Sequence, residues 1–156
     1  MNLNQFKNLI RVVSKSEAFK IRDDYINRFI DVNKEHYKKY VATLQEYSDG
    51  ICYTGYLWDC LKEPKIVDFQ SINALSHKLN EVFVLWDIHT KERIFIKDYW
   101  KFGKDEVLYL NFGLLLDNLV YLPEDIYIFD KSLNWTFILT HEEINGKRWC
   151  IQSGNI

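Results

Sequence analysis

Hydrophobic residues in the first part of the chain recur at intervals of three and four positions. Over residues 3–13, 18–30 and 34–47 this spacing puts the apolar side chains on one face of a helix. Asn33 is a suitable N-cap for the third segment, because its side chain can accept a hydrogen bond from the first helical turn. The pattern therefore predicts two or three packed helices at the start of the chain.

Two shorter helices are expected before the pattern changes. Leu57 and Leu61 lie four positions apart and the segment stops at Pro64, which favours a short helix over a strand. Asp68 can cap a second and clearer helix. The apolar residues of that helix share one face: Phe69, Ile72, Leu75 and Leu79.

A β-like pattern replaces the helical one at Glu81. Residues 82–88 are β-branched and aromatic without helical spacing, and residues 93–100 resume that character after a polar connection. A β-hairpin is the simplest interpretation of these two segments. Residues 104–120 are ambiguous, since they fit a helix and in part a strand; we expect a helix that ends before Pro123.

The last part of the chain is predicted to form a three-stranded meander. Its β-like segments are residues 125–130, 135–142 and 147–153. Asn145 and Gly146 join the last two segments, and this pair is a strong hairpin signal because both central residues of a type I′ turn need positive φ. We therefore predict an α+β fold, with N-terminal helices packed on a mostly antiparallel C-terminal sheet, as a single domain over residues 1–156.

The composition is that of a folded globular chain, with 47% hydrophobic and 27% charged residues. A formal net charge of −2 provides no global positive field to attract nucleic acid or an anionic membrane. The basic segment KEHYKKY is better explained as a solvated helix face than as an RNA contact. No apolar stretch approaches the roughly 20 residues of a membrane span, and the first residues lack a secretory signal, so we expect a cytoplasmic protein.

The cysteines argue against a disulfide framework and a zinc ribbon. Cys52, Cys60 and Cys150 are odd in number and show no Cys-x-x-Cys spacing. Reduced and mostly buried thiols are the expectation. The chain also lacks a phosphate-binding loop, a dinucleotide-binding fingerprint and a nucleophile elbow. We accordingly expect no metal and no cofactor.

The predicted turn brings one candidate catalytic pair together. Counting outward from a two-residue turn gives these opposite pairs: Glu143 with Arg148, Glu142 with Trp149, and His141 with Cys150. An imidazole beside a thiol would activate a thiolate or supply two metal ligands. A nucleophilic site also needs an oxyanion hole and an orienting group, and no motif supplies them. A structural hairpin is the better interpretation of this segment.

Other polar residues have simple structural explanations. Asp87 and His89 would share one side of a strand end, which favours a solvent-facing side over a metal site. Glu124 and Asp125 precede a strand, where turn formation explains them. The residues expected to form a binding surface lie on the last two strands: Trp135, His141, Glu142, Glu143, Arg148 and Trp149.

Three blocks carry a resemblance to a known family. GYLWDCL, LPEDIYIFDKSLNWTFILTHEE and KRWC resemble the conserved blocks of a small bacterial family of single-domain proteins to which no activity has been assigned. The likeness covers most of the chain from about Gly55 onward. It implies a compact intracellular bacterial protein, and it implies no mechanism.

Two function classes follow from these observations. Small, slightly acidic, aromatic-rich α+β proteins without a catalytic motif are common among bacterial immunity proteins, which bind and block toxins; this is an analogy. A protein-binding module with a protein partner is therefore our first hypothesis. The alternative is a small hydrolase-like or metal-dependent enzyme using His141, Cys150 and a nearby carboxylate. The oligomeric state is left open.

Overall fold

A computed structural model describes all 156 residues as a mixture of helices and antiparallel strands. The strands are β1 (Arg11–Val12), β2 (Gln45–Tyr47), β3 (Gly50–Cys52), β4 (Lys65–Val67), β5 (Glu81–Leu85), β6 (Leu108–Asn111), β7 (Ile126–Phe129), β8 (Trp135–Ile144) and β9 (Lys147–Gly154). Seven of them form one sheet in the order β1-β6-β5-β7-β8-β9-β4, and β2 pairs with β3 alone. Every pairing is antiparallel.

Five α-helices and three 3₁₀ turns accompany the strands. The α-helices are α1 (Leu3–Asn8), α2 (Lys15–Phe29), α3 (Glu35–Tyr40), α4 (Phe69–Asn73) and α5 (Phe112–Asp117). The 3₁₀ turns are η1 (Leu57–Cys60), η2 (Lys91–Arg93) and η3 (Leu119–Tyr121). None of the helices combines the length and the apolar character that a bilayer-spanning segment requires.

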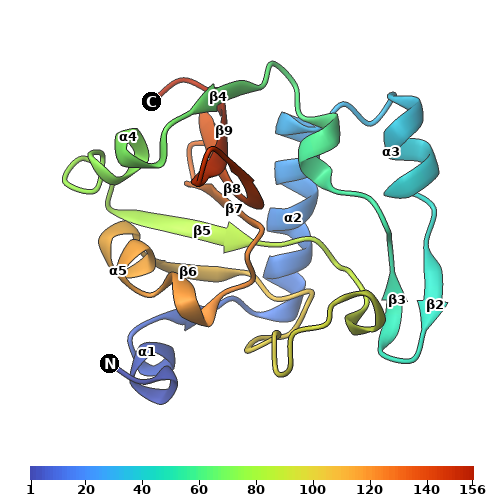
Figure 1. The fold of residues 1–156 in the computed structure, drawn as a ribbon, viewed down its shortest axis with the longest axis horizontal. Coiled ribbons are helices and arrows are strands. Elements are labelled where there is room, and N and C mark those ends of the chain that lie inside the picture. The colour runs from blue at the N-terminus through green and yellow to red at the C-terminus, as the bar shows by residue number, and fades with distance from the viewer.

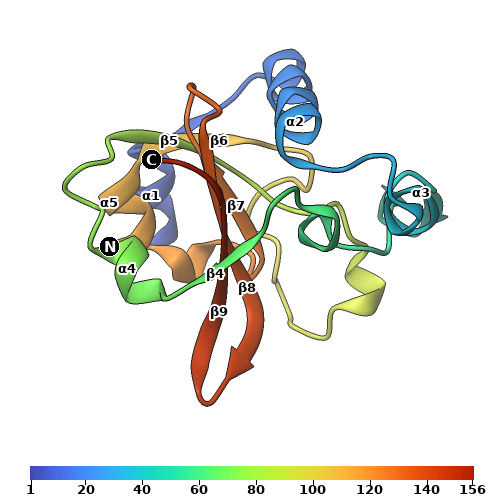
Figure 2. The same cartoon turned by 90° about the horizontal axis from the view of Figure 1, so that it is seen from above.

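The seven-stranded sheet lies between two groups of helices. Helices α1, α4 and α5 lie on one side of it, whereas α2 and α3 lie on the other (Figures 1 and 2). Each side has its own hydrophobic core. Phe6, Ile72 and Phe112 belong to the core on the α5 side, and Tyr25 and Phe29 belong to the core on the α2 side. The predicted α+β fold, with the sheet mostly in the C-terminal half, is confirmed.

Burial on both faces explains the sequence of the central strands. All four residues of β7, and four of the five in β5, are buried. Successive side chains of such a strand point to opposite faces, and both faces are buried. The strand therefore reads as a continuous run of apolar residues, without the alternation of apolar and polar residues seen in a half-exposed strand. Alternate residues serve the two cores: Ile126 and Ile128 point to the α5 side, and Tyr127 and Phe129 to the α2 side.

The helix predictions are correct in part. Helix α2 matches the predicted segment, and the Asp68 side chain caps α4 by accepting a hydrogen bond from the Gln70 amide at 3.0 Å. The third predicted helix was too long, because α3 ends at Tyr40 and the following residues form the β2–β3 hairpin. Contacts distant in sequence hold that hairpin: Asp49 accepts hydrogen bonds from Thr90 and Lys91 and pairs with Lys104.

The predicted hairpin of residues 82–88 and 93–100 is wrong. Strand β5 pairs with β6 on one side and β7 on the other, while residues 94–100 form no strand. The apolar residues of this segment are not those of a buried strand, since Phe95 is 96% exposed and Asp98 has a positive φ of 54°. The ambiguous segment 104–120 contains both elements, because strand β6 leads directly into helix α5.

A β-bulge overturns part of the predicted β8–β9 register. Asn145 and Gly146 have φ values of 54° and 75°, as a type I′ turn requires, and Glu143 lies opposite Arg148 as predicted. The ladder then slips, so that Leu139 lies opposite Cys150. The predicted pairing of His141 with Cys150 is therefore wrong, and so is that of Glu142 with Trp149. Extra residues on one strand cause such a slip and turn the side chains to new directions.

We expect Gly146→Val to destabilise the protein by about 1–3 kcal/mol, because a β-branched residue is strained at positive φ. The cost is conformational, since a Cβ at Gly146 would meet no atom within 4 Å. Gly154→Ala should cost more, because Gly154 also has positive φ and its Cβ would collide with the Asn134 carbonyl. Thermal melting of the two variants measures both effects, and an unchanged melting temperature for Gly146→Val would contradict the turn assignment.

Candidate functional site

A cavity of about 310 Å³ lies at one end of the sheet, where β8 and the segment that follows β5 continue past the start of β7. Asp87, His89 and His141 are among the residues that line it. The irregular segment 94–100 covers another side. A second hollow of about 590 Å³ adjoins the first, and the two share these lining residues: Ile96, Tyr99, Glu124 and His141. Together they form one groove along this end of the sheet.

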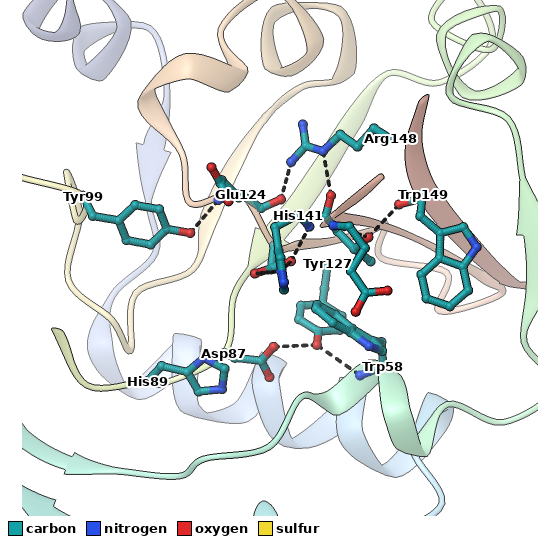
Figure 3. A network of polar contacts seen from close by, with 12 residues as sticks. Trp58, Asp87, His89, Tyr99, Glu124, Tyr127, His141, Arg148 and Trp149 are labelled. Atoms are coloured by element: carbon teal, nitrogen blue, oxygen red, sulfur yellow. Dashed lines mark hydrogen bonds and ion pairs between the residues drawn. The ribbon is translucent and has the colours of Figure 1, made fainter. Parts of the chain in front are cut away.

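The Asp87 carboxylate is the centre of a buried hydrogen-bond network. It accepts hydrogen bonds from the Tyr53 hydroxyl at 2.9 Å, the Tyr127 hydroxyl at 2.7 Å and the Leu57 amide at 3.1 Å. The Tyr127 oxygen in turn accepts from the Trp58 amide at 3.1 Å (Figure 3). A carboxylate only 3% exposed is thus supplied with three donors, as a buried charge requires.

Burial sets the acid–base properties of this network. It raises the pKa of the Asp87 carboxyl, and the neighbouring His89 and the three donors oppose the shift. Burial also raises the pKa of Tyr53 and Tyr127 well above the ordinary value, so both phenols remain protonated donors. His89 is fixed beside the network by a 2.6 Å hydrogen bond between its Nε2 and the Gly55 carbonyl oxygen.

His141 and Asp125 form a second polar pair at the cavity. The Nδ1 atom of His141 lies 2.9 Å and 3.0 Å from the two carboxylate oxygens of Asp125, which also accepts the His141 amide at 2.7 Å. Burial raises the pKa of Asp125, and the hydrogen bond from His141 opposes the shift. The imidazole ring lies 5.7 Å from the ring of Tyr56 and 5.9 Å from that of Trp58. Because Asp125 occupies Nδ1, Nε2 is the ring atom available to a ligand.

Arg148 connects the hairpin to the strand that precedes it. Its Nε donates to the Thr140 carbonyl at 2.9 Å, and its Nη2 donates to the Glu124 carbonyl (Figure 3). The Glu124 amide donates to the Tyr99 hydroxyl at 2.7 Å, which ties the irregular segment to the same corner. Arg148 therefore has backbone acceptors and no carboxylate partner, so its charge is not neutralised by an ion pair.

The structure brings some of the predicted binding residues together and separates others. His141, Glu143 and Arg148 line the second hollow, and Glu142 is exposed beside them. Trp149 is half-buried. Trp135 is only 3% exposed, and its indole N–H donates to Asp130. The prediction that Trp135 belongs to the binding surface is therefore wrong.

The predicted catalytic pair is not assembled. Cys150 is fully buried in the core on the α5 side, whereas His141 lies beside Tyr56 and Trp58 on the opposite side of the sheet. Burial raises the pKa of the Cys150 thiol to about 11. The other two cysteines are also buried and unpaired. No group of three or more His, Cys, Asp or Glu side chains lies close enough to hold a metal ion.

The sequence interpretation missed the Asp87 network. Asp87 was expected on a solvent-facing side, and it is one of the most buried polar residues. The signal was present in the sequence, because an aspartate that directly follows the apolar run Val82–Trp86 needs buried donors once that run is buried. Tyr127 gave the complementary signal, since it is the one residue with a polar group in strand β7.

Comparisons of the chain with protein-family models, with curated proteins and with solved structures find no match. The geometry of the site therefore carries the functional argument by itself.

We expect Tyr127→Phe to lower the free energy of unfolding by about 1–3 kcal/mol, because it leaves the Trp58 amide without an acceptor and removes a donor from Asp87. Tyr47→Phe is the matched control, since its hydroxyl bonds Gln45 at the surface. The control should change stability by less than about 0.5 kcal/mol. Equal effects in urea titrations of the two variants would contradict the buried network.

The raised pKa of Asp87 predicts a pH dependence. Below the ordinary value of 3.8 the carboxyl is protonated in both the folded and the unfolded state. Between that value and the raised folded pKa the unfolded chain releases the proton first, so folding stability falls as the pH rises. Asp87→Asn cannot titrate. We therefore expect the free energy of unfolding of Asp87→Asn to fall furthest below that of wild type at low pH. The difference should shrink as the pH rises through this window, as urea titrations at several pH values would show. A difference independent of pH would contradict the raised pKa of Asp87.

Proposed function

We propose that this chain is a protein-binding module of the immunity type, which acts by occupying the surface of a protein partner. The observation that carries the proposal is the projecting end of the β8–β9 hairpin with the groove beside it. Both features expose apolar and charged side chains, and some of these, such as Glu143 and Ile144, make no internal hydrogen bond. The resemblance of the sequence blocks to a bacterial family without assigned activity is compatible with this class and adds no mechanism.

The hairpin extends beyond the strands that flank it. Pairing of β7 with β8 stops at Leu139, and pairing of β4 with β9 stops at Cys150. At residues 141–149, β8 and β9 therefore have only each other as neighbours, and no strand lies along the outer edge of either. Figure 2 shows the turn projecting away from the body. Open strand edges offer unpaired backbone groups to another chain, which is a common mode of protein recognition.

Side chains on this surface have the composition of a protein interface. Ile144 near the turn is 56% exposed, and Val120 and Ile96 in the adjoining hollow are 79% and 51% exposed. Phe95 is 96% exposed at the rim of the first cavity. Exposed apolar residues that lie close together are typical of an interaction surface, whereas the same residues scattered singly are normal on any protein.

Arg148 supplies a prepositioned cation in the middle of this surface. Its two backbone acceptors fix the guanidinium, so little side-chain entropy is lost when the remaining N–H groups bind a partner's carboxylate. Glu143 lies opposite it across the strands, and Glu142 adds a further negative charge. Such an arrangement favours a partner of mixed charge in one fixed orientation.

The enzyme alternative has weaker support. Its proposed thiol, Cys150, lies in the core on the other side of the sheet from His141. His141 with Asp125 has the arrangement of a base and its orienting carboxylate, yet no serine or cysteine is among the residues that line the cavity. The protein-binding hypothesis therefore has priority.

Affinity capture with variants of the hairpin tests the proposal. Glu143→Lys and Ile144→Asp alter exposed side chains that make no internal hydrogen bond, so both variants should fold. Phe19→Ala on α2 is the matched control, because Phe19 is 77% exposed and α2 lies far from the turn (Figure 2). We expect one stoichiometric partner from the native cell extract to bind wild type and control, and to bind both hairpin variants at least about tenfold more weakly.

The purified partner then decides between the hypotheses. Titration of that partner with each variant should reproduce the order of affinities seen in the capture. Equal affinity of the hairpin variants and the control would overturn the proposed surface, and a catalytic turnover lost in His141→Ala while partner binding persists would favour the enzyme alternative.

A further inference from the structure

The first cavity has a net negative lining. It contains the carboxylates of Asp87, Glu124 and Asp125 and one arginine, Arg93. Arg93 is exposed, so water and salt screen its charge, whereas the side chain of Asp125 is only 16% exposed and Asp87 is buried. The carboxylate charges therefore dominate the field inside the cavity, and this field favours a cationic ligand.

The negative field acts on the cavity wall itself. Burial, and after it the charges of Asp125 and Asp87, raise the pKa of the Tyr56 hydroxyl to about 12, although Arg93 opposes the shift. The charge of Asp87 also raises the pKa of Asp125. Neither aspartate has a lysine or arginine as an ion-pair partner. The wall at Tyr56 and Asp125 therefore disfavours a further negative charge and would gain from a positive one.

Hydrogen bonds from the protein already occupy most of the acceptor positions of these two aspartates. Asp87 accepts three, from two tyrosine hydroxyls and one backbone amide. The oxygens of Asp125 make three contacts with the amide and the ring of His141. A carboxylate has about four acceptor positions, so the charges are available to a ligand while little capacity to accept its hydrogen bonds remains. A cation without N–H donors fits this condition best, because it leaves no donor unsatisfied.

Accessible aromatic rings form another part of the lining. Tyr56, Tyr99 and Trp100 are half-buried, and Phe95 is exposed at the rim. The rings of Tyr99 and Trp100 lie 5.1 Å apart at 84°, and the Tyr56 ring lies 4.7 Å from that of His89, also at 84°. Rings at such steep angles bound a space from more than one side. Aromatic faces attract cations within about 6 Å, and cages of such rings bind quaternary ammonium groups.

Two of these rings carry no cation from the chain itself. Lys104 lies over the Trp100 ring at 5.8 Å, but no lysine or arginine lies over Tyr56 or Tyr99. The volume of about 310 Å³ lies at the small end of the range of about 300–1,000 Å³ that small-molecule sites occupy. The ligand is therefore expected to be small.

We propose that this cavity binds a small cation of the trimethylammonium type. Its methyl groups pack against the rings of Tyr56, Tyr99 and Trp100. Its charge is balanced by Asp125 and Asp87 without hydrogen bonds to them. A free small molecule or a trimethylated lysine of another protein supplies such a group. The proposal does not rest on the protein-binding hypothesis, because it concerns the cavity and not the projecting hairpin.

Titration with matched small molecules tests the charge and the methyl groups separately. The probes are choline, dimethylbutanol as its uncharged carbon analogue of the same shape, and ethanolamine as its primary ammonium counterpart. In calorimetric titrations choline should bind saturably, and the other two at least about tenfold more weakly. The methyl proton resonance of choline should also move upfield, because aromatic faces shield protons above them. Choline binding no more tightly than either analogue would overturn the proposal.

A tripeptide with trimethyllysine as its central residue distinguishes the two sources of the group. Tighter binding of the peptide than of choline would assign the group to a protein side chain, and tighter binding of choline would assign it to a free small molecule. Absence of saturable binding by both would overturn the proposal.

Charge variants should give effects of opposite sign. Arg93→Gln removes the positive charge from the lining and should strengthen choline binding about two- to threefold, whereas Asp125→Asn should weaken it about tenfold. Lys97→Gln is the matched control and should leave binding unchanged, since Lys97 lies on the same segment as Arg93 and does not line this cavity. Weaker binding of choline to Arg93→Gln than to the control would overturn the charge assignment.

The aromatic contact is tested at Tyr56. Tyr56→Leu should weaken choline binding about fivefold, because it removes a ring face, and Tyr56→Phe should restore binding to within about twofold of wild type. Thermal melting shows whether both variants fold. Equal binding of choline to wild type and to a folded Tyr56→Leu would overturn the aromatic contact.

Discussion

The carboxylate of Asp87 is the interaction on which the architecture of this end of the molecule depends. It joins two segments that are distant from it and from each other in sequence: residues 53–57 after β3, through Tyr53 and Leu57, and strand β7, through Tyr127. Hydrophobic burial alone would hold these segments near one another without fixing their orientation. Because an unpaired carboxylate is costly in the core, the three donors must be in place together, and the network specifies a single arrangement.

A sheet covered on both faces leaves its ends and edges for function. The cores on the α2 side and the α5 side occupy both faces of the central strands. At one end, β5 leads to Asp87, Asp125 precedes β7, and β8 continues to His141. Polar and ionisable side chains therefore gather there, and Asp87 reaches into the core on the α2 side, where Tyr53 and Tyr127 bond it. The bulge in β8 contributes to this arrangement, because it directs His141 toward Asp125 and away from Cys150.

Local patterns in the sequence predicted those features that depend on neighbouring residues. The α2 helix, the Asp68 cap and the Asn145–Gly146 turn are of this kind, and all three are present. Long-range pairing was not predictable from the same patterns. Strand β5 takes partners from residues 108–111 and 126–129, and an apolar run carries no information about which strand it will meet.

The candidate site was predicted in the same uneven way. Its members on the hairpin, His141, Glu143 and Arg148, were predicted, and the turn and the pairing of Glu143 with Arg148 are correct. The bulge was not visible, so the His141–Cys150 pair was wrong. Asp87 was wrongly predicted to face solvent, because polar residues at the end of a strand are usually exposed. The donors that stabilise its buried carboxylate lie at residues 53, 57 and 127, far from it in sequence.

Native-state amide hydrogen exchange at Leu57 and Trp58 measures the central claim most directly. Both amides lie in a short 3₁₀ turn, and their acceptors are the Asp87 carboxylate and the Tyr127 hydroxyl. If the network holds this end together, both amides exchange as slowly as those of β7 in the wild type, and Asp87→Ala accelerates them far more than the amide of Ile138 in β8. Rapid exchange of Leu57 and Trp58 in the wild type, at the rate of unbonded loop amides, would contradict the account.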